Sequence, residues 1–171
     1  MDGNGSARKF RHFHEVFRAM WVIVSAGLVF ACASGGSSSS ETGVTNPLPL
    51  TPVTLPGLNP AAVPPGHYVF TGFREWNDFW SDYHKTAAPD LDLEESALVA
   101  VFLGQKPNPG YSAGIVGAVE HRDEVVIEVV EYLPAPGMMY AQMIVYPYAA
   151  RLIPETGKTI RFEVTKQAGR P

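Results

Sequence analysis

The sequence predicts an α+β domain, in which a mostly antiparallel, sandwich-like β-sheet structure carries one amphipathic helix near its N-terminal end. Only one segment spaces its aromatic residues three and four apart, as a helix face does, whereas about six short runs have the β-branched and aromatic composition of strands. Strands and helices do not alternate as in βαβ units. With 46% hydrophobic and 18% charged residues the chain is globular, and 15 prolines and 16 glycines are too many for a purely helical protein.

Residues 1–31 have the pattern of an export signal. Four basic residues, the last of them Arg18, precede an uncharged apolar stretch from Ala19 to Ala31. This stretch is shorter than the roughly 20 residues that a transmembrane helix needs. We therefore predict a signal peptide, with an uncleaved N-terminal anchor as an alternative.

The signal ends in "LVFAC", which resembles the lipobox of bacterial lipoproteins. The resemblance implies that Cys32 is lipidated, with palmitate among the acyl chains, and becomes the mature N-terminus. The protein is then expected in the cell envelope, anchored to a membrane on its periplasmic or cell-surface side. An ordinary secretory signal with a chance cysteine is the alternative. Cys32 is the single cysteine, so no intramolecular disulfide and no cysteine-based zinc site is predicted.

Residues 32–66 have the composition of a linker. A serine- and glycine-rich stretch is followed by seven prolines between Asn46 and Pro65. The first composition favours a flexible coil and the second an extended chain, so we predict a spacer that holds a domain away from a surface. A ligand for partner domains is the alternative interpretation of the proline-rich part.

Residues 67–171 are predicted to be the folded domain. "HYVFT", residues 67–71, suits a strand, and the following segment predicts a helix with Thr71 as its N-cap and Pro89 as a stop. One face of this helix carries an aromatic stripe, which we interpret as core rather than as a ligand platform. The stripe consists of Phe73, Trp76, Phe79, Trp80 and Tyr83.

Further strands follow the helix. The apolar run from Ala97 to Gly104 predicts a strand buried on both faces. "IVGAVE" and "EVVIEVVEYL" predict an antiparallel hairpin around "HRD". "MMYAQMIVYPY" predicts another strand, in which Pro147 marks an end, an edge or a bulge, and "KTIRFEVT" predicts the closing strand after the turn "PETG".

The turn "KPNPGY", residues 106–111, stands between two of these strands. Pro107 and Pro109 restrict φ and bias the residues before them toward extended conformations, and Gly110 is free to take positive φ. The turn therefore delivers Tyr111 to the start of a strand. Either Tyr111 packs the end of the sheet, or it is exposed beside the second turn "PAPG", residues 134–137, and the two stiff loops form a binding edge.

The sequence gives little support for catalysis, metal binding or nucleic-acid binding. "GYSAG" matches the spacing of a G-x-S-x-G elbow around Ser112, but "IVGAVEH" after it predicts a strand where the elbow requires a helix. No two histidines are placed as a metal-ligand pair, and the acidic connector at residues 90–95 lacks the glycine of an EF-hand loop. A net charge of -4 predicts no nucleic-acid partner. We expect a protein that is not an enzyme and has no cofactor.

Four stretches of the chain resemble the C-terminal domain of the PrcB family over about residues 67–165. They are "EWNDFW", "ALVAVFLGQKPNPGYSAGIVGAVE", "PAPG" and "QMIVYPYAARLIP". The family consists of exported bacterial proteins, often lipoproteins, and is named for a subunit that accompanies a subtilisin-like surface protease. The resemblance implies a non-enzymatic domain that binds or stabilises a protease or its precursor. Asn108 and Pro109 depart from the threonine and glycine that are common in the family at this place.

The "NPGY" letters also resemble, more weakly, a loop of chagasin-like cysteine protease inhibitors. A protease inhibitor or peptide-binding module is therefore the alternative function, and a serine hydrolase is the least favoured one. The residues expected to contact a protein partner are those of the two loops and the proline after the later apolar run. They are Pro107, Asn108, Pro109, Gly110, Tyr111, Pro134, Pro136 and Pro147.

Overall fold

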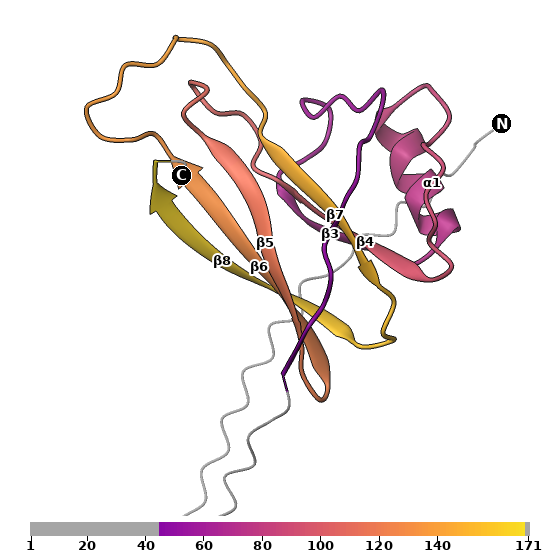
Figure 1. Ribbon diagram of the computed structural model, residues 1–171. Helices are drawn as coiled ribbons and strands as arrows, with labels where there is room; N and C mark the ends of the chain where they lie inside the picture. Colours follow the sequence, from indigo (N-terminus) through magenta and orange to yellow (C-terminus); the bar gives the residue numbers. More distant parts are fainter. Residues whose placement is uncertain (1–44, 170–171) are drawn as a thin grey trace, which may run out of the picture. The chain divides into compact units, whose positions relative to one another are not determined.

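The computed structural model describes residues 45–169 (Figure 1). Eight strands and one helix form this part of the chain. In chain order they are β1 (Asn46–Pro47), β2 (Thr51–Pro52), β3 (Gly66–Phe70), α1 (Phe73–Tyr83), β4 (Ser96–Phe102), β5 (Ser112–Glu120), β6 (Glu124–Leu133), β7 (Tyr148–Pro154) and β8 (Thr159–Ala168). The predicted signal peptide, Cys32 and the serine-rich part of the predicted linker lie outside the described residues. No helix within residues 45–169 is long and apolar enough to span a membrane.

The strands form two four-stranded sheets, as the sandwich-like prediction requires. Sheet A has the order β1-β5-β6-β8 and sheet B the order β2-β7-β4-β3. All neighbours pair antiparallel except β6 and β8, which pair parallel. The chain leaves β6 in sheet A, crosses to β7 in sheet B and returns to sheet A as β8, so β8 runs in the same direction as β6 (Figure 1).

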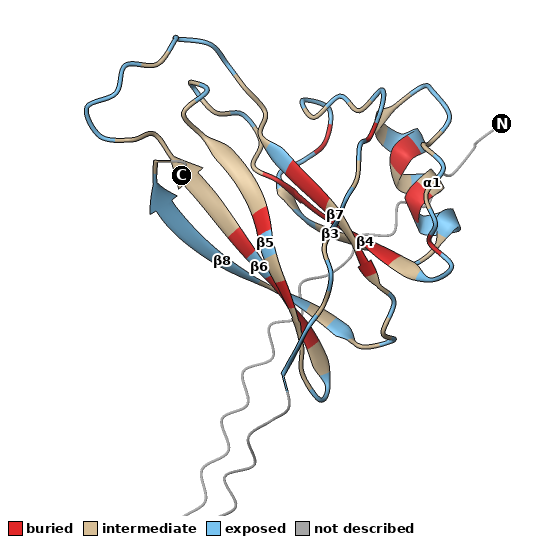
Figure 2. Cartoon of the chain, in the orientation of Figure 1, coloured by how far each residue is buried: buried red, intermediate tan, exposed pale blue. Residues whose placement is uncertain are grey.

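Strand β4 belongs to two cores at once. Its alternate residues Ala97, Val99 and Val101 pack toward sheet A, while Leu98, Ala100 and Phe102 pack toward the helix. Alternation of side chains across the sheet explains why the run has almost no polar residue, since both faces of β4 are covered. The prediction of a strand buried on both faces is confirmed, and the layers are sheet A, sheet B and helix α1 (Figure 2).

The aromatic stripe of α1 covers the outer face of sheet B. Trp76 and Trp80 are each 1% exposed, and the indole nitrogen of Trp76 donates a hydrogen bond of 3.0 Å to the carbonyl of Pro89. The core interpretation is therefore confirmed for most of the stripe, but Phe73 is 55% exposed. The prediction of Thr71 as N-cap is wrong, because Gly72 occupies that position without a side-chain hydrogen bond.

The N-terminal boundary of the folded domain lies earlier than the predicted residue 67. Leu55 and Val63 are 4% and 3% exposed within the core that contains Trp76 and Trp80. β1 pairs with β5, and β2 pairs with β7. The linker prediction is thus wrong for residues 45–66. Apolar side chains between the prolines pack into the core, and the extended backbone that proline favours is compatible with an edge strand.

The predicted strand "MMYAQMIVYPY" is wrong in its position. The strand of this region, β7, begins only at Tyr148, and residues 138–147 form a loop with one isolated bridge between Val145 and Lys106. Pro147 has no N–H to donate to a ladder and directly precedes the strand, so it marks the strand's beginning rather than its end. The other predicted strands, the hairpin and the closing strand are confirmed.

Candidate protein-binding surface

The two loops that the sequence singled out meet at one end of the sandwich. The backbone N–H of Lys106 donates to the carbonyl of Val145 at 2.8 Å, and the N–H of Val145 donates back to Lys106 at 3.0 Å. The N–H of Leu103 donates to the carbonyl of Pro147 at 3.0 Å. Residues 104–111 and residues 134–147 are therefore joined as one surface, which we call the loop surface (Figure 1).

Close packing around Gly110 holds the longer loop in place. A Cβ atom at Gly110 would lie 2.8 Å from Cζ and 2.9 Å from Cε1 of Tyr140, so the tyrosine ring covers the glycine directly. The hydroxyl of Tyr140 in turn accepts a hydrogen bond of 3.0 Å from the N–H of Ala135. A glycine is thus needed at position 110 because Tyr140 approaches closely, and not because the backbone has positive φ there. The glycine of this loop with positive φ is Gly104, at 68°.

The shorter loop is closed by Asn108. Its side-chain oxygen accepts a hydrogen bond of 3.0 Å from the N–H of Gly110, and its carbonyl accepts one of 3.4 Å from the N–H of Tyr111. An asparagine that bonds the backbone two residues further on is a common way to close a tight turn. Asn108 therefore has a structural task in this turn.

Tyr111 is half-buried, which lies between the two alternatives left open by the sequence. The ammonium nitrogen of Lys106 lies 5.6 Å from the centre of its ring, within range of a cation–π contact. Pro107, Pro109 and Pro136 are exposed, while Asn108, Gly110, Pro134 and Pro147 are half-buried. All the predicted contact residues therefore lie in the two loops of the loop surface, and three of the prolines among them are exposed.

The most exposed apolar side chains of this surface were not among the predicted contact residues. Met138, Met139, Met143 and Ile144 are 64%, 97%, 56% and 57% exposed. Their apolar sequence predicted a buried strand, and buried side chains are not candidates for contact with a partner. A signal was available, however: no charged residue occurs between Leu133 and Arg151, and three methionines lie within six positions.

Ser112 does not sit in a nucleophile elbow. It begins β5, where it pairs with Tyr132, and β5 continues to Glu120 without any helix. A G-x-S-x-G elbow presents its serine on a sharp turn between a strand and a helix, so the "GYSAG" match is a coincidence of letters. Within residues 45–169 no group of three His, Cys, Asp or Glu side chains could hold a metal ion.

The acidic connector lines a shallow hollow beside the start of α1. Asp90, Asp92 and Glu94 contribute to it together with Phe73. No charged or polar side chain is buried in the described part of the chain. A run of exposed carboxylates with no buried polar partner has the character of a solvated face, so we place no ligand there.

The fold and this surface define a class of protein: a mostly β, sandwich-like α+β domain that presents a stiff, mainly apolar loop surface whose longer loop, residues 134–147, has no charged residue. Residues 97–151 match the family model described as PrcB C-terminal, which confirms the resemblance identified from the sequence. This segment of the chain is therefore similar to the PrcB C-terminal domain, and it includes both loops of the loop surface. The family points to a protease-complex subunit-like role. No curated protein and no solved structure matches the chain.

Proposed function

We propose that this protein is an exported lipoprotein that binds and stabilises a partner protein, a protease or its precursor, through the loop surface. The observation that carries the proposal is the exposure of Met138, Met139, Met143 and Ile144 in one uncharged loop. Centres of protein interfaces are enriched in methionine and aromatic residues and are depleted of charge, and the loop has this composition. Methionine also adapts its shape to a partner because its side chain is unbranched and polarizable.

The attachment of the loop supports the same proposal. Two backbone hydrogen bonds between Lys106 and Val145 and the packing of Tyr140 on Gly110 fix the loop before a partner arrives. A loop that is already ordered loses less conformational entropy on binding, so more of the contact energy remains as affinity. The family match supports a protease as the partner, with a subtilisin-like enzyme as the specific expectation.

The binding test compares a charged residue in the loop surface with the same charge elsewhere. We expect Met139→Asp combined with Met143→Asp to lower recovery of the partner at least about tenfold, since an interface centre tolerates an unpaired charge poorly. The tagged full chain is used to capture proteins from envelope extract, and captured protease is measured by its activity and by labelling with an active-site serine reagent. Phe73→Asp is the matched control, because Phe73 is 55% exposed but lies on helix α1.

The outcomes separate the two functions that involve a protease. Active protease captured by the wild type and by Phe73→Asp, but not by the loop variant, supports a stabilising subunit. Protease that is captured but inactive until released supports an inhibitor instead. Equal capture by the loop variant and the wild type contradicts the loop surface as the binding site, and capture of no protease contradicts both functions.

The lipid anchor has its own test. Since thioether linkage requires the cysteine sulfur, Cys32→Ser is expected to move the protein from the membrane fraction to the soluble fraction. Cell fractionation with mass measurement of the mature N-terminus checks this. Wild-type protein that carries no acyl chain, or a variant that stays in the membrane fraction, would argue against lipidation at Cys32.

A further inference from the structure

β8 is the last strand of sheet A. One of its two backbone edges pairs with β6, and the other edge has no partner strand within residues 45–169. The paired edge of β8 follows β6 in one continuous register, from Glu124 opposite Thr159 to Leu133 opposite Ala168. Figure 2 shows that β8 is exposed over most of its length. An edge of this kind presents a row of unpaired N–H and C=O groups, which is a template for another strand.

The other edges of the two sheets are protected in ways that β8 is not. β1 and β2 have two residues each, and each contains a proline, Pro47 or Pro52. β3 has five residues. β8 has ten residues, contains no proline and has no register shift against β6. Short strands, prolines and bulges are three common devices against edge-to-edge pairing, and β8 lacks them. Charged side chains are a fourth device, and β8 has these, of both signs.

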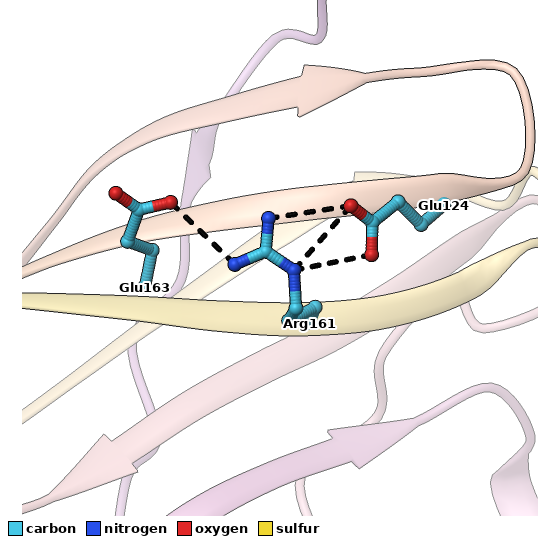
Figure 3. A network of polar contacts seen from close by, with 3 residues as sticks. All are labelled: Glu124, Arg161 and Glu163. Atoms are coloured by element: carbon cyan, nitrogen blue, oxygen red, sulfur yellow. Dashed lines mark hydrogen bonds and ion pairs between the residues drawn. The ribbon is translucent and has the colours of Figure 1, made fainter. Parts of the chain in front are cut away.

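The outer face of β8 carries an ordered set of charges (Figure 3). The guanidinium of Arg161 donates three hydrogen bonds of 3.1, 3.2 and 3.4 Å to the carboxylate of Glu124. These bonds raise the pKa of Arg161 and lower the pKa of Glu124. Glu163 receives one contact of 3.5 Å from Arg161, and its side chain is 62% exposed, so its carboxylate has room for a second partner.

The inner face of β8 is apolar where it covers the core between the sheets. Ile160 and Phe162 pack against that core, and the Phe162 ring stacks on His67 with 4.9 Å between ring centres. Val164 is 37% exposed on the same face. From Ile160 to Val164, therefore, an apolar inner row alternates with an outer row in which a positive residue, Arg161, and a negative residue, Glu163, are two positions apart.

We propose that two copies of this chain pair their β8 strands antiparallel about a two-fold axis at Phe162, which joins the two A sheets into one continuous sheet. With a two-fold axis perpendicular to the sheet, the core-facing sides of both copies lie on the same side of the joined sheet. The axis then passes between one residue of β8 and the same residue of the second copy, so these two residues lie opposite each other. With Phe162 at the axis, Arg161 of each copy lies opposite Glu163 of the other. Ile160 then lies opposite Val164 and Thr159 opposite Thr165, so the charged and apolar rows match over residues 159–165. Beyond this segment Lys158 lies opposite Lys166, but each of these lysines already has a carboxylate partner in its own chain, Glu120 and Glu131 respectively.

Neighbouring registers match less well. An axis at Glu163 would place this carboxylate opposite its own copy, and like charges directly opposite each other destabilise a strand pair. An axis at Val164 would place Glu163 opposite Thr165 and would leave Arg161 without a facing carboxylate. Directly opposed residues in antiparallel strands have Cβ atoms about 4.5–5.5 Å apart, close enough for Arg161 to reach the partner's carboxylate.

The self-complementary charge pattern is the reason to commit to a second copy rather than to a foreign strand. Two-fold dimers are the commonest assemblies of soluble proteins, and they use one patch twice. The proposal is independent of the function proposed above. The proposed axis residue Phe162 pairs with Ile127, whereas the loop surface begins after Leu133, which pairs with Ala168 six positions further along β8, so one molecule can use both surfaces.

The test uses two charge variants and their mixture. Glu163→Lys places like charges opposite each other twice, and so does Arg161→Glu. We expect each variant alone to raise the dimer dissociation constant about tenfold or more, because two attractive pairs become repulsive. In an equimolar mixture the heterodimer has Arg161 opposite Glu163 on one side of the axis and the introduced lysine opposite the introduced glutamate on the other. We therefore expect the mixture to regain the wild-type dissociation constant.

Analytical ultracentrifugation of the full chain in mild detergent, over a dilution series, measures these constants. Glu94→Lys is the matched control, since Glu94 is an exposed glutamate of the connector before β4 in sheet B and is not on the β8 edge. Hydrogen exchange gives a second readout, because outward-facing amides of β8 should gain protection as the dimer forms. A wild type that stays monomeric at all concentrations overturns the proposal. A dimer that neither variant weakens, or a mixture that does not regain dimer, overturns it as well.

Discussion

Deletion of residues 1–66 is expected to unfold the domain, whereas deletion of residues 1–44 is expected to leave it folded. The longer deletion removes Leu55 and Val63 from the core cluster that also contains Trp76 and Trp80, and so exposes part of that core to water. Burial of one such aliphatic side chain contributes about 1.5–3 kcal/mol, and a domain has only about 5–15 kcal/mol of net stability. The shorter deletion keeps every described contact.

Thermal and urea unfolding of the two truncated chains would check this prediction. A point variant separates the loss of side-chain packing from the loss of the chain itself. We expect Leu55→Ala to lower the free energy of unfolding by about 2–5 kcal/mol, and Thr54→Ala, one exposed position earlier, to change it by less than about 0.5 kcal/mol. Equal stability of the two truncated chains would show that residues 45–66 are the spacer that their composition suggests.

Trp76→Ala is expected to lower the free energy of unfolding by about 3–5 kcal/mol, the range for truncation of a large buried aromatic residue. Trp76 is 1% exposed, and its ring centre lies 5.3 Å from that of Phe70 and 5.2 Å from that of Trp80. The variant also leaves the carbonyl of Pro89 without its donor, which adds to the loss if water does not replace it.

Two control variants divide this effect into its parts. Trp76→Phe keeps most of the apolar contact but removes the hydrogen bond to Pro89, so a smaller loss is expected. Phe73→Ala changes an aromatic residue of the same helix that is 55% exposed, and we expect it to cost less than about 1 kcal/mol. Similar losses for Trp76→Ala and Phe73→Ala, measured by chemical unfolding, would contradict the assignment of the core to the Trp76 side of the helix.

The loop surface and the edge of β8 give the domain two distinct ways to make protein contacts. The loop surface offers uncharged apolar side chains on a braced loop, which suits a partner with a complementary pocket. The β8 edge offers backbone hydrogen bonds and a self-complementary row of charges. If both are used, a dimer joined through β8 presents two loop surfaces, and a partner with two sites would bind it with higher avidity than one copy alone.

Much of the fold could be predicted because its signals are local. The aromatic spacing in α1 and the unbroken apolar run of β4 follow directly from which faces are covered, and both predictions are confirmed for the buried residues. The hairpin of β5 and β6 was also predicted, but the register of its two strands was not. β5 has a bulge between Ile115 and Gly117, and no residue of the turn indicates this bulge. The parallel pairing of β8 with β6 arises because the chain passes through sheet B between these two strands. The sequence of β8 does not indicate this path.

The candidate site was predicted only in part, for the same kind of reason. The stiff turns at residues 106–111 and 134–137 were visible because proline and glycine restrict or free the backbone wherever they stand. That these turns meet depends on Lys106 and Val145, which are far apart in sequence and pair across the end of the sandwich. The exposure of the methionines could not be predicted, because an apolar segment has the same composition whether it covers a core or faces a partner.

The sequence by itself determined the fold class, the helix, most of the strands and the stiff "KPNPGY" turn, since these depend on side-chain periodicity and backbone restriction within short segments. Only the tertiary structure decided that residues 45–66 are part of the domain, that residues 138–147 are an exposed loop, and that β8 is an open edge. In each of these cases the local composition permits two states. The choice between them is made by whether a distant part of the chain supplies a surface to cover or a strand to pair with.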